Sequence, residues 1–349
     1  MPRKDKPALD VAVFIPSLAK GGAEKVMGSI AENMRQMGVE IELVVAGRPL
    51  ENSVFTGFVS ITYLNARNVA ASIPALLRYC RDRRPTTLLS SLTHANNAAL
   101  VVKMLAGYSI SVVVSERVSI RRPKSHVQLA ERVHRLMRQV LYPTADSIIC
   151  VSQQLAEDLE NTLVRRPRRI TSIPNPLDAP SLRKAASMPI KVPSSLQGAA
   201  PTVLFVGRLA KQKGVEVLIQ AFSELRKGQK CNLVLIGDGP EKSKIVSMIR
   251  SLGIESDVVV CGSIANPYPW FKFASLLVLP SHYEGFPNVL LEALALDLPV
   301  VATDCLTGPR EILEDGKWGR LVEPNNPAEL ATAMAQTLAI RGEPRGSAR

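Results

Sequence analysis

Two separated stretches of the chain carry charged residues at spacings that suit an anionic, polyhydroxylated ligand. Arg208 and Lys213 stand in a glycine-flanked turn after an apolar run, where two cations can neutralise a diphosphate as its charge develops. Glu284 and Glu292 follow far downstream, and carboxylates accept hydrogen bonds from sugar and ribose hydroxyls. Together the two stretches predict a site for a nucleotide sugar. The competing interpretations are two solvated loop cations, a charge at a helix start for Glu284 and an exposed helix position for Glu292.

Glycines open two further turns. Gly21 and Gly22 follow the first apolar run and precede an expected helix over Ala23–Met37. The free amides at that helix start would attract an anion, and glycine lets the backbone approach it closely. A plain strand-to-helix turn needs only one glycine, so that interpretation stays open, and the sequence matches neither the Gly-x-Gly-x-x-Gly nor the Walker pattern. Gly237 begins Gly-Asp-Gly-Pro, a tight turn with or without ligand contact.

Three polar residues follow predicted strands in the first half of the chain. His94 comes after the apolar run Thr87–Ser91 and could polarise a donor sugar or face an acceptor, although a lone loop histidine is also commonly structural. Glu116 and Arg117 end another strand. They either face the same site or form a local ion pair.

Short apolar or β-branched runs alternate with helix-like stretches along the whole chain. Runs without alternation suit strands buried on both faces, and intervening helices imply parallel sheets. The predicted strands are Val11–Ile15, Ile41–Val45, Thr87–Ser91, Val112–Ser115, Ser147–Val151, Thr171–Ile173, Val203–Val206, Leu233–Ile236, Val258–Val260, Leu276–Leu279 and Val300–Ala302.

The density of proline between Pro174 and Pro201 marks a domain boundary, because proline interrupts helices and internal strands. The sequence therefore predicts an α/β protein of two doubly wound Rossmann-like domains facing across a cleft. Residues 1–180 form an acceptor-side domain, 181–201 a Pro-rich linker, and 202–349 a nucleotide-sugar-binding domain. Ligands are expected at the carboxyl ends of strands and in the cleft. A helix is predicted over Pro327–Leu338, followed by a frayed terminus.

The chain has a formal net charge of +12, which favours acidic partners. We name its densest run of cations the cationic patch; its members are Arg121, Arg122, Lys124, Arg132, Arg135 and Arg138. The patch predicts contact with anionic lipid headgroups, worth about 1 kcal/mol per cation, or else a solvated helix face. Nucleic-acid binding is the non-enzymatic alternative and predicts interleaved aromatic residues, of which residues 117–138 contain none.

The cysteines and the apolar runs indicate the compartment. The five cysteines are scattered, without metal-ligand spacing, and are interpreted as buried thiols in a reducing compartment. The chain opens without a signal-peptide pattern, and its apolar stretches stay below the roughly 18 residues that span a bilayer. We expect a cytoplasmic protein that contacts membranes only peripherally.

These residues resemble the family-4 retaining glycosyltransferases, which have GT-B architecture. The resemblance covers about residues 10 to 335, and the Glu-x7-Glu spacing is the family's signature. The matching motifs are Pro16-Ser17 with Gly21-Gly22-Ala23-Glu24, Val206-Gly207-Arg208 with Lys213-Gly214, Gly237-Asp238-Gly239-Pro240, Pro280-Ser281 with Glu284-Gly285-Phe286-Pro287 through Glu292, and Pro299-Val300-Val301-Ala302-Thr303.

The resemblance implies a role for each matching residue. Arg208 and Lys213 would hold the donor diphosphate, Glu284 the transferred sugar and Glu292 the ribose. Catalytic roles would fall to Glu284, Arg208, Lys213 and His94. The implied donor-binding set is Gly21, Gly22, Arg208, Lys213, Gly237, Glu284, Gly285, Phe286, Asn288 and Glu292. Transfer in this family retains the anomeric configuration and needs no metal and no cofactor beyond the nucleotide sugar, because the leaving phosphate helps to deprotonate the acceptor.

The segments around His94 and Glu116 look most like members that act on polyprenyl-diphosphate-linked sugars. This implies a hexosyl- or N-acetylhexosaminyltransferase for surface polysaccharide or glycoconjugates, peripheral at the inner face of the cell membrane. UDP is the family's usual nucleotide, although nothing in the sequence distinguishes UDP from GDP. Two departures concern His94, whose preceding strand lacks the family's acidic residue, and the C-terminus, which is short of the family's cross-over helix. A nucleotide-sugar 2-epimerase and a transferase that binds donor without turnover remain alternatives.

Overall fold

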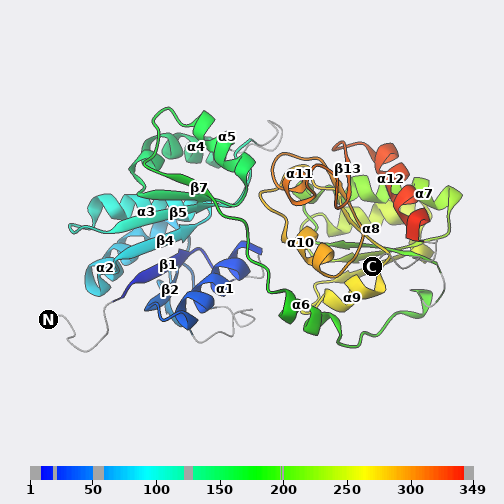
Figure 1. Cartoon of the computed structure of the whole chain (residues 1–349), viewed down its shortest axis with the longest axis horizontal. Coiled ribbons are helices and arrows are strands. Elements are labelled where there is room, and N and C mark those ends of the chain that lie inside the picture. Colours follow the sequence, from blue (N-terminus) through cyan, green and yellow to red (C-terminus); the bar gives the residue numbers. More distant parts are fainter. Residues whose placement is uncertain are drawn as a thin grey trace. The chain divides into compact units, whose positions relative to one another are not determined.

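The computed structural model describes residues 9–18, 22–49, 59–121, 129–196, 198 and 200–341. The chain divides into two compact units, Met1–Pro176 and Leu177–Arg349, called unit 1 and unit 2 below. Each unit is built from parallel strands with helices packed against them (Figure 1). The α/β class and the pair of doubly wound domains predicted from the apolar runs are confirmed.

The described part of unit 1 forms a seven-stranded sheet in the order β3-β2-β1-β4-β5-β6-β7. Chain order reverses between β1 and β4, which is the switch point where doubly wound sheets bind ligands at their carboxyl edge. The strands are β1 Val11–Ile15, β2 Ile41–Val45, β3 Ser60–Tyr63, β4 Thr87–Ser91, β5 Ser111–Glu116, β6 Ser147–Cys150 and β7 Ile170–Ser172.

The helices of unit 1 cover the apolar strands. Met27 and Ala31 of the first helix pack against Val13 of β1 and Leu43 of β2 in one continuous core. The helices are α1 Gly22–Gln36, α2 Ile73–Arg83, α3 Thr93–Leu105, α4 Leu129–Leu141 and α5 Gln153–Thr162, with short 3-10 turns η1 Ala70–Ser72 and η3 Tyr142–Thr144.

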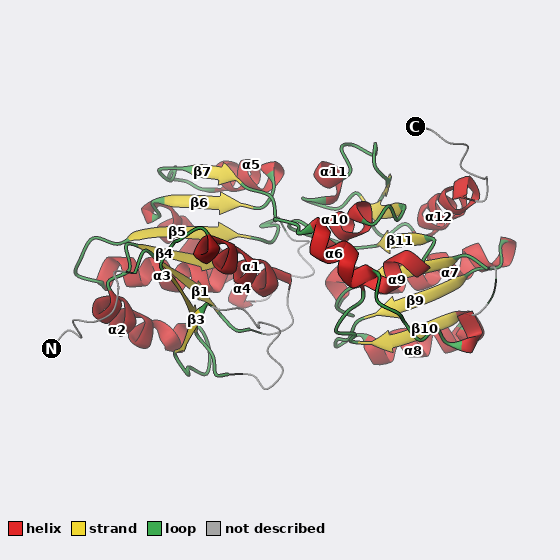
Figure 2. Cartoon of the chain, turned by 60° about the horizontal axis from the view of Figure 1, so that its bottom comes forward, coloured by secondary structure: helices red, strands yellow, loops and turns green. Residues whose placement is uncertain are grey.

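Unit 2 contains a six-stranded sheet among its described residues, in the order β10-β9-β8-β11-β12-β13. Chain order reverses between β8 and β11, so these two strands define the switch point of this unit. The strands are β8 Thr202–Val206, β9 Asn232–Ile236, β10 Val258–Gly262, β11 Leu276–Leu279, β12 Val300–Thr303 and β13 Arg320–Val322. Strands β9 and β10 lie side by side in Figure 2.

Both faces of this second sheet are buried. Phe205 of β8 lies in the core that includes Leu218 and Met334, whereas its neighbour Leu204 lies in a second core that includes Phe271 and Leu290. Two-sided burial explains the uninterrupted apolar runs. The helices are α6 Ala179–Ala186, α7 Val215–Gly228, α8 Lys242–Ser251, α9 Tyr268–Phe273, α10 Asn288–Ala295, α11 Pro309–Ile312 and α12 Pro327–Arg341, with 3-10 turns η4 Ser194–Leu196, η5 Lys211–Lys213 and η6 Glu255–Asp257.

The predicted Pro-rich linker over 181–201 is wrong. Helix α6 begins within the proline-rich stretch and packs against α9 and α10, so it belongs to unit 2. Pro180 occupies the first turn of this helix, where the missing amide of proline costs nothing. Leu196 is also buried in the core of unit 2. The boundary therefore falls at Pro176, where the two units divide.

Other sequence predictions differ from the structure in smaller ways. The edge strands β3 and β13 were not predicted, because β3 is only half-buried and β13 begins with the exposed Arg320. Four of the cysteines are buried as expected, and Cys261 is half-buried. The predicted helix over Pro327–Leu338 continues to Arg341, and the chain beyond it lies outside the described residues. Among the described residues, no helix is both long enough and apolar enough to cross a bilayer.

Candidate functional site

The switch point of unit 2 brings together residues that are 71 positions apart in sequence. The loop after β8 carries Arg208 and Lys213, and the loop after β11 carries Glu284. Strands β8 and β11 are neighbours in the sheet, so parallel pairing places both loops at the same carboxyl edge.

Lys213 and Glu284 form a direct ion pair. The Lys213 Nζ donates to Glu284 Oε1 at 2.6 Å, and the Ser281 hydroxyl donates to the same oxygen at 2.6 Å. Glu284 is only 5% exposed and Ser281 is fully buried. The Thr307 hydroxyl donates to the backbone carbonyl of Glu284 at 2.7 Å, which fixes the backbone as well. The predicted residues therefore meet, and Ser281 and Thr307 are supporting residues that the sequence did not single out.

Backbone contacts hold the two loops together. Gln212 donates its side-chain amide to the carbonyl of Tyr283 at 2.9 Å. Gly214 has φ +57°, and a Cβ there would overlap the carbonyl of Pro280. Because of this close approach only glycine fits the end of the Lys213 loop.

Gly237 is required for a similar reason. Its φ is +146°, and a Cβ at this position would overlap the carbonyl of Gly207, at the start of the Arg208 loop. The Leu209 amide donates to the carbonyl of Asp238 at 2.9 Å, which ties the same two loops together. The Gly-Asp-Gly-Pro turn therefore shapes the loop that carries the cations.

Arg208 and Lys213 differ in their surroundings. Arg208 is exposed, and among the described residues its side chain has no hydrogen bond or ion pair. The Lys213 side chain is 20% exposed and forms the ion pair with Glu284. A guanidinium that is free in this way can bind a phosphate with two parallel hydrogen bonds.

Glu292 lies on α10, which begins at Asn288 directly after Pro287. The Tyr268 hydroxyl donates to Glu292 Oε1 at 3.2 Å. Burial raises the pKa of Tyr268, and the Glu292 charge raises it further. Glu292 is thus a half-buried carboxylate with a fixed partner rather than an exposed helix residue.

The remaining predicted donor residues lie around the start of α10. Gly285 is buried, and Phe286 packs against the core of unit 2. A Cβ on Gly308 would press against the Gly285 carbonyl and the ring of Pro287, so glycine is required where this loop passes. Asn288 is the first residue of the helix. These residues therefore connect Glu284 to the start of α10.

In unit 1, Gly22 begins α1, the helix that follows β1 at the switch point of that sheet. Gly22 is exposed at the start of α1, and a Cβ there would meet nothing within 4 Å. Gly21 lies outside the described residues. The expected helix is confirmed as Gly22–Gln36.

His94 lies at the start of α3, after β4, on the other side of the same switch point. It is exposed, and its ring centroid is 6.4 Å from that of His134 on α4. Surrounding protein atoms lower the pKa of His94, and the neighbouring His134 lowers it further. The imidazole is therefore held in its neutral form at neutral pH.

A buried polar network supports the start of α3. Glu116, at the end of β5, accepts from the Thr93 hydroxyl at 2.9 Å and from the Tyr142 hydroxyl at 2.6 Å. Asn96 donates to the Tyr142 oxygen at 3.2 Å, and Arg138 Nε lies 3.8 Å from Glu116. The network was not predicted, because its members come from four separate elements.

Arg138 corrects the predicted cationic patch. It is only 3% exposed, because it packs over the Tyr142 ring and beside Glu116, so it cannot face a membrane. Arg132 and Arg135 are exposed as expected, and Arg121 pairs with Asp158 at 3.0 Å. The predicted members Arg122 and Lys124 lie outside the described residues.

Arg117 does not pair with Glu116. Its guanidinium instead donates to Asn175 Oδ1 at 2.6 Å and contacts the sulfur of Met27 at 3.4 Å. Burial lowers the pKa of Arg117 to about 10, an effect that Glu24 opposes. The local ion pair between Glu116 and Arg117, one of the two interpretations of these residues, is therefore absent among the described residues.

Comparison with known proteins identifies the family. A model described as Glycosyltransferase Family 4 matches residues 20–179, and one described as Glycosyl transferases group 1 matches residues 200–339. The chain belongs to the family-4 glycosyltransferases. This membership favours a glycosyltransferase over the epimerase and nucleic-acid-binding alternatives.

Two Campylobacter jejuni enzymes are similar to this chain over nearly its whole length. The first, N-acetylgalactosamine-N,N'-diacetylbacillosaminyl-diphospho-undecaprenol 4-alpha-N-acetylgalactosaminyltransferase, is 27% identical over 90% of this chain and 86% of its own length. The second, an alpha-1,4-N-acetyl-D-galactosaminyltransferase whose name specifies a PP-undecaprenol substrate, is 25% identical over 96% and 90%.

A solved structure shares the fold. Anabaena HepE, crystallised in complex with UDP and glucose, superimposes with a TM-score of 0.78 over 96% of this chain and 91% of its own, at 18% identity. That similarity shows the GT-B fold of the family. Within the described residues no group of three or more potential ligands is placed to hold a metal ion.

Proposed function

We propose that this glycosyltransferase moves a hexosyl or N-acetylhexosaminyl group from a UDP-sugar to a lipid-linked saccharide, with retention and without a metal. The observation that carries the proposal is the Lys213–Glu284 pair at the switch point of unit 2, on the same loop as Arg208, whose side chain has no partner among the described residues. Two cations and a buried carboxylate at one sheet edge match the charges and hydroxyls of a nucleotide sugar.

The two cations would supply the charge that a metal supplies elsewhere. As the bond between the anomeric carbon and the diphosphate oxygen breaks, its electron pair moves to that oxygen. Arg208 and Lys213 stabilise the resulting charge. The acceptor hydroxyl forms the new bond on the same face of the sugar, and its proton passes to the departing phosphate. The protein then needs no nucleophile of its own, and Glu284 can bind hydroxyls of the transferred sugar.

The relatives support the proposed acceptor and nucleotide. The names of both Campylobacter enzymes specify an undecaprenol-linked substrate and the transfer of N-acetylgalactosamine. These names support a polyprenyl-diphosphate-linked acceptor and a role in surface glycan or glycoconjugate synthesis. HepE, which has the same fold, was solved with UDP, so UDP is the first nucleotide to test.

Helix α4 supports peripheral attachment to the inner face of the cell membrane. Val133, Leu136 and Val140 are 51%, 68% and 66% exposed and recur at helical spacing. Arg132 and Arg135 are exposed on the same helix. An apolar stripe flanked by cations is the pattern of a helix that lies in the headgroup region of an anionic bilayer.

Vesicle flotation tests the attachment. Leu136→Ser combined with Arg135→Gln should reduce binding to phosphatidylcholine vesicles containing phosphatidylglycerol, because both the apolar and the charge contributions fall. Met37→Ser, which changes a side chain that is 82% exposed on the same unit, is the matched control. Equal binding by all three proteins would rule out α4 as the attachment surface.

The transfer reaction is tested by nucleotide release from a panel of UDP- and GDP-sugars, with and without a polyprenyl-lipid extract. We expect release from one UDP-N-acetylhexosamine or UDP-hexose, stimulated by the lipid, unchanged by EDTA and abolished in Glu284→Gln. Glu224→Gln, in an exposed ion pair with Lys227, is the matched control and should keep full activity. Anomeric analysis of the product tests retention. Release that persists unchanged in Glu284→Gln would contradict the proposed site.

A further inference from the structure

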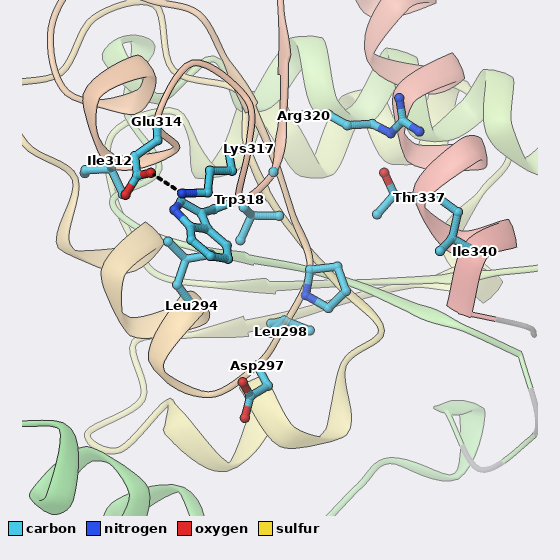
Figure 3. Close-up of a pocket in the computed structure, with 13 residues that line it drawn as sticks. Leu294, Asp297, Leu298, Ile312, Glu314, Lys317, Trp318, Arg320, Thr337 and Ile340 are labelled. Atoms are coloured by element: carbon cyan, nitrogen blue, oxygen red, sulfur yellow. Dashed lines mark hydrogen bonds and ion pairs between the residues drawn. The ribbon is translucent and has the colours of Figure 1, made fainter. Parts of the chain in front are cut away.

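Unit 2 contains a second hollow, at the edge opposite the candidate donor site. It lies at the amino ends of β12 and β13 and has a volume of about 830 Å³, within the range of small-molecule sites. The donor-site loops follow the carboxyl ends of β8 and β11, so the two sites are separate. The residues on which the argument rests are Asp297, Trp318, Arg320 and Ile340 (Figure 3).

Trp318 is exposed yet firmly held. The residue is 51% exposed, while its backbone amide donates to the Leu313 carbonyl at 3.2 Å. Lys317 Nζ lies 4.6 Å from the centre of the indole and also pairs with Glu314 at 2.8 Å. A Cβ on Gly319, the next residue, would overlap the Val300 side chain, so the backbone beside the indole is pressed against β12.

The loop before Trp318 has an uncommon backbone. Glu314, Asp315 and Gly316 have φ values of 44°, 56° and 95° in succession. Residues other than glycine seldom adopt this region, and such conformations persist where the surrounding structure enforces them. The loop therefore holds the backbone in a fixed conformation beside a large apolar side chain that is half exposed to solvent.

The polar groups around the ring suit a neutral ligand that offers many hydroxyls. Asp297 and Arg320 lie towards opposite ends of the hollow in Figure 3, and neither side chain has a partner among the residues described. The charged lining residues are Asp297, Glu314, Lys317 and Arg320, two acids and two bases. Because these charges balance, the hollow has no surplus cation to attract a phosphate or an acidic chain.

We propose that this hollow binds a neutral oligosaccharide, namely the growing glycan of the acceptor or product, at a distance from the transfer site. The apolar face of one sugar ring stacks on Trp318. Asp297 accepts from sugar hydroxyls and Arg320 donates to them, while the exposed Ile340 contacts the ring edge. The choice of a saccharide rests on the proposed function, since the reaction lengthens a glycan.

Indole NMR of the isotope-labelled protein tests the proposal. The chain has two tryptophans, and the buried Trp270 is an internal control for Trp318. Titration with an α-1,4-linked N-acetylgalactosamine trisaccharide, without lipid or phosphate, should shift the Trp318 signal and leave that of Trp270 in place. Trp318→Ala and Arg320→Ala should each weaken binding about tenfold by calorimetry, and Leu252→Ala, an exposed apolar residue elsewhere on unit 2, should not.

The outcomes separate this inference from the transfer reaction. Binding needs no turnover, so the indole shift should persist in Glu284→Gln even if no donor is ever hydrolysed. In an active preparation Trp318→Ala should leave kcat unchanged and raise KM for long acceptors but not for a monosaccharide acceptor. The proposal is overturned if neither this trisaccharide nor a glucose-based one shifts the Trp318 signal. It is also overturned if the signal instead changes on dilution, which would identify the hollow as a contact between copies.

Discussion

Replacing Lys213 by alanine should destabilise unit 2 more than replacing Glu284 by glutamine does. The Lys213→Ala variant leaves a carboxylate that is 5% exposed with the Ser281 hydroxyl as its remaining side-chain donor. Removing one partner of a buried ion pair costs about 3–5 kcal/mol. The Lys213 side chain is 20% exposed, which places the expected loss near the lower limit, about 3 kcal/mol.

The glutamine variant behaves differently. The amide oxygen at position 284 can still accept from Ser281 and from Lys213, and the lysine can extend into water. The loss is then that of a weakened hydrogen bond, about 1 kcal/mol. Combining Lys213→Met with Glu284→Gln removes both charges and should cost less than the two single losses added together.

Tryptophan fluorescence during urea unfolding measures these differences directly. Both tryptophans, Trp270 and Trp318, belong to unit 2, so the signal reports the unfolding of that unit alone. Lys242→Ala is the matched control, because Lys242 pairs with Asp238 at 3.0 Å with both side chains about half exposed, and such pairs contribute under about 1 kcal/mol. A Lys213→Ala loss no larger than that of Lys242→Ala would refute the view of Glu284 as a buried charge that needs its lysine.

Three further predictions concern the backbone, the buried network and the histidine. Gly237→Ala should destabilise unit 2 by at least about 2 kcal/mol in the same urea assay, because its Cβ would overlap the Gly207 carbonyl. Tyr142→Phe should destabilise unit 1 by about 2 kcal/mol, measured by hydrogen exchange of β5 amides, because buried Glu116 loses a donor. His94 has a folded pKa below its unfolded value, so the unfolded chain protonates first. The stability of unit 1 should therefore fall as pH drops through about 6.5, and His94→Gln should flatten that fall.

Each of these predictions has a control in the same chain. Gly22→Ala should cost little, because a Cβ there meets nothing within 4 Å; a loss equal to that of Gly237→Ala would contradict the steric argument. Tyr108→Phe removes a buried hydroxyl without a hydrogen-bond partner among the described residues and should not destabilise. Identical pH slopes for the wild type and His94→Gln would show that His94 is not the titrating group.

The sequence predicted the elements that are buried on two faces. Strands such as Leu276–Leu279 appear as uninterrupted apolar runs, and their bounds agree with the structure. Edge strand β3 was not predicted because its residues are mixed in polarity, with Ser60 exposed and the other three half-buried. The linker error arose because proline at the first turn of α6 has the same sequence signature as a break.

The candidate site was predicted as separate roles, and the structure joins them. Residue chemistry and the family resemblance suggested that Lys213 meets phosphate and Glu284 meets sugar, but not that the two contact one another across 71 positions. Arg138 was misassigned because it stands in a row of exposed arginines, although its side chain turns inward to Glu116. Side-chain partners of this kind depend on which loops the strand order of the sheet brings together. The local sequence pattern around one residue does not encode that strand order.

The ion pair also bears on how a donor site of this composition works. A lysine left in water would have to be desolvated and ordered each time a diphosphate bound, whereas Lys213 is already positioned by Glu284 during folding. Preorganised charges of this kind stabilise a developing anion without reorganisation at the moment of reaction. Under the proposed function, the incoming diphosphate competes with Glu284 for the Lys213 ammonium. Each bond that the phosphate takes from Lys213 leaves the Glu284 carboxylate freer to accept a sugar hydroxyl, so diphosphate and sugar should bind cooperatively, and UDP alone should bind more weakly than the complete UDP-sugar.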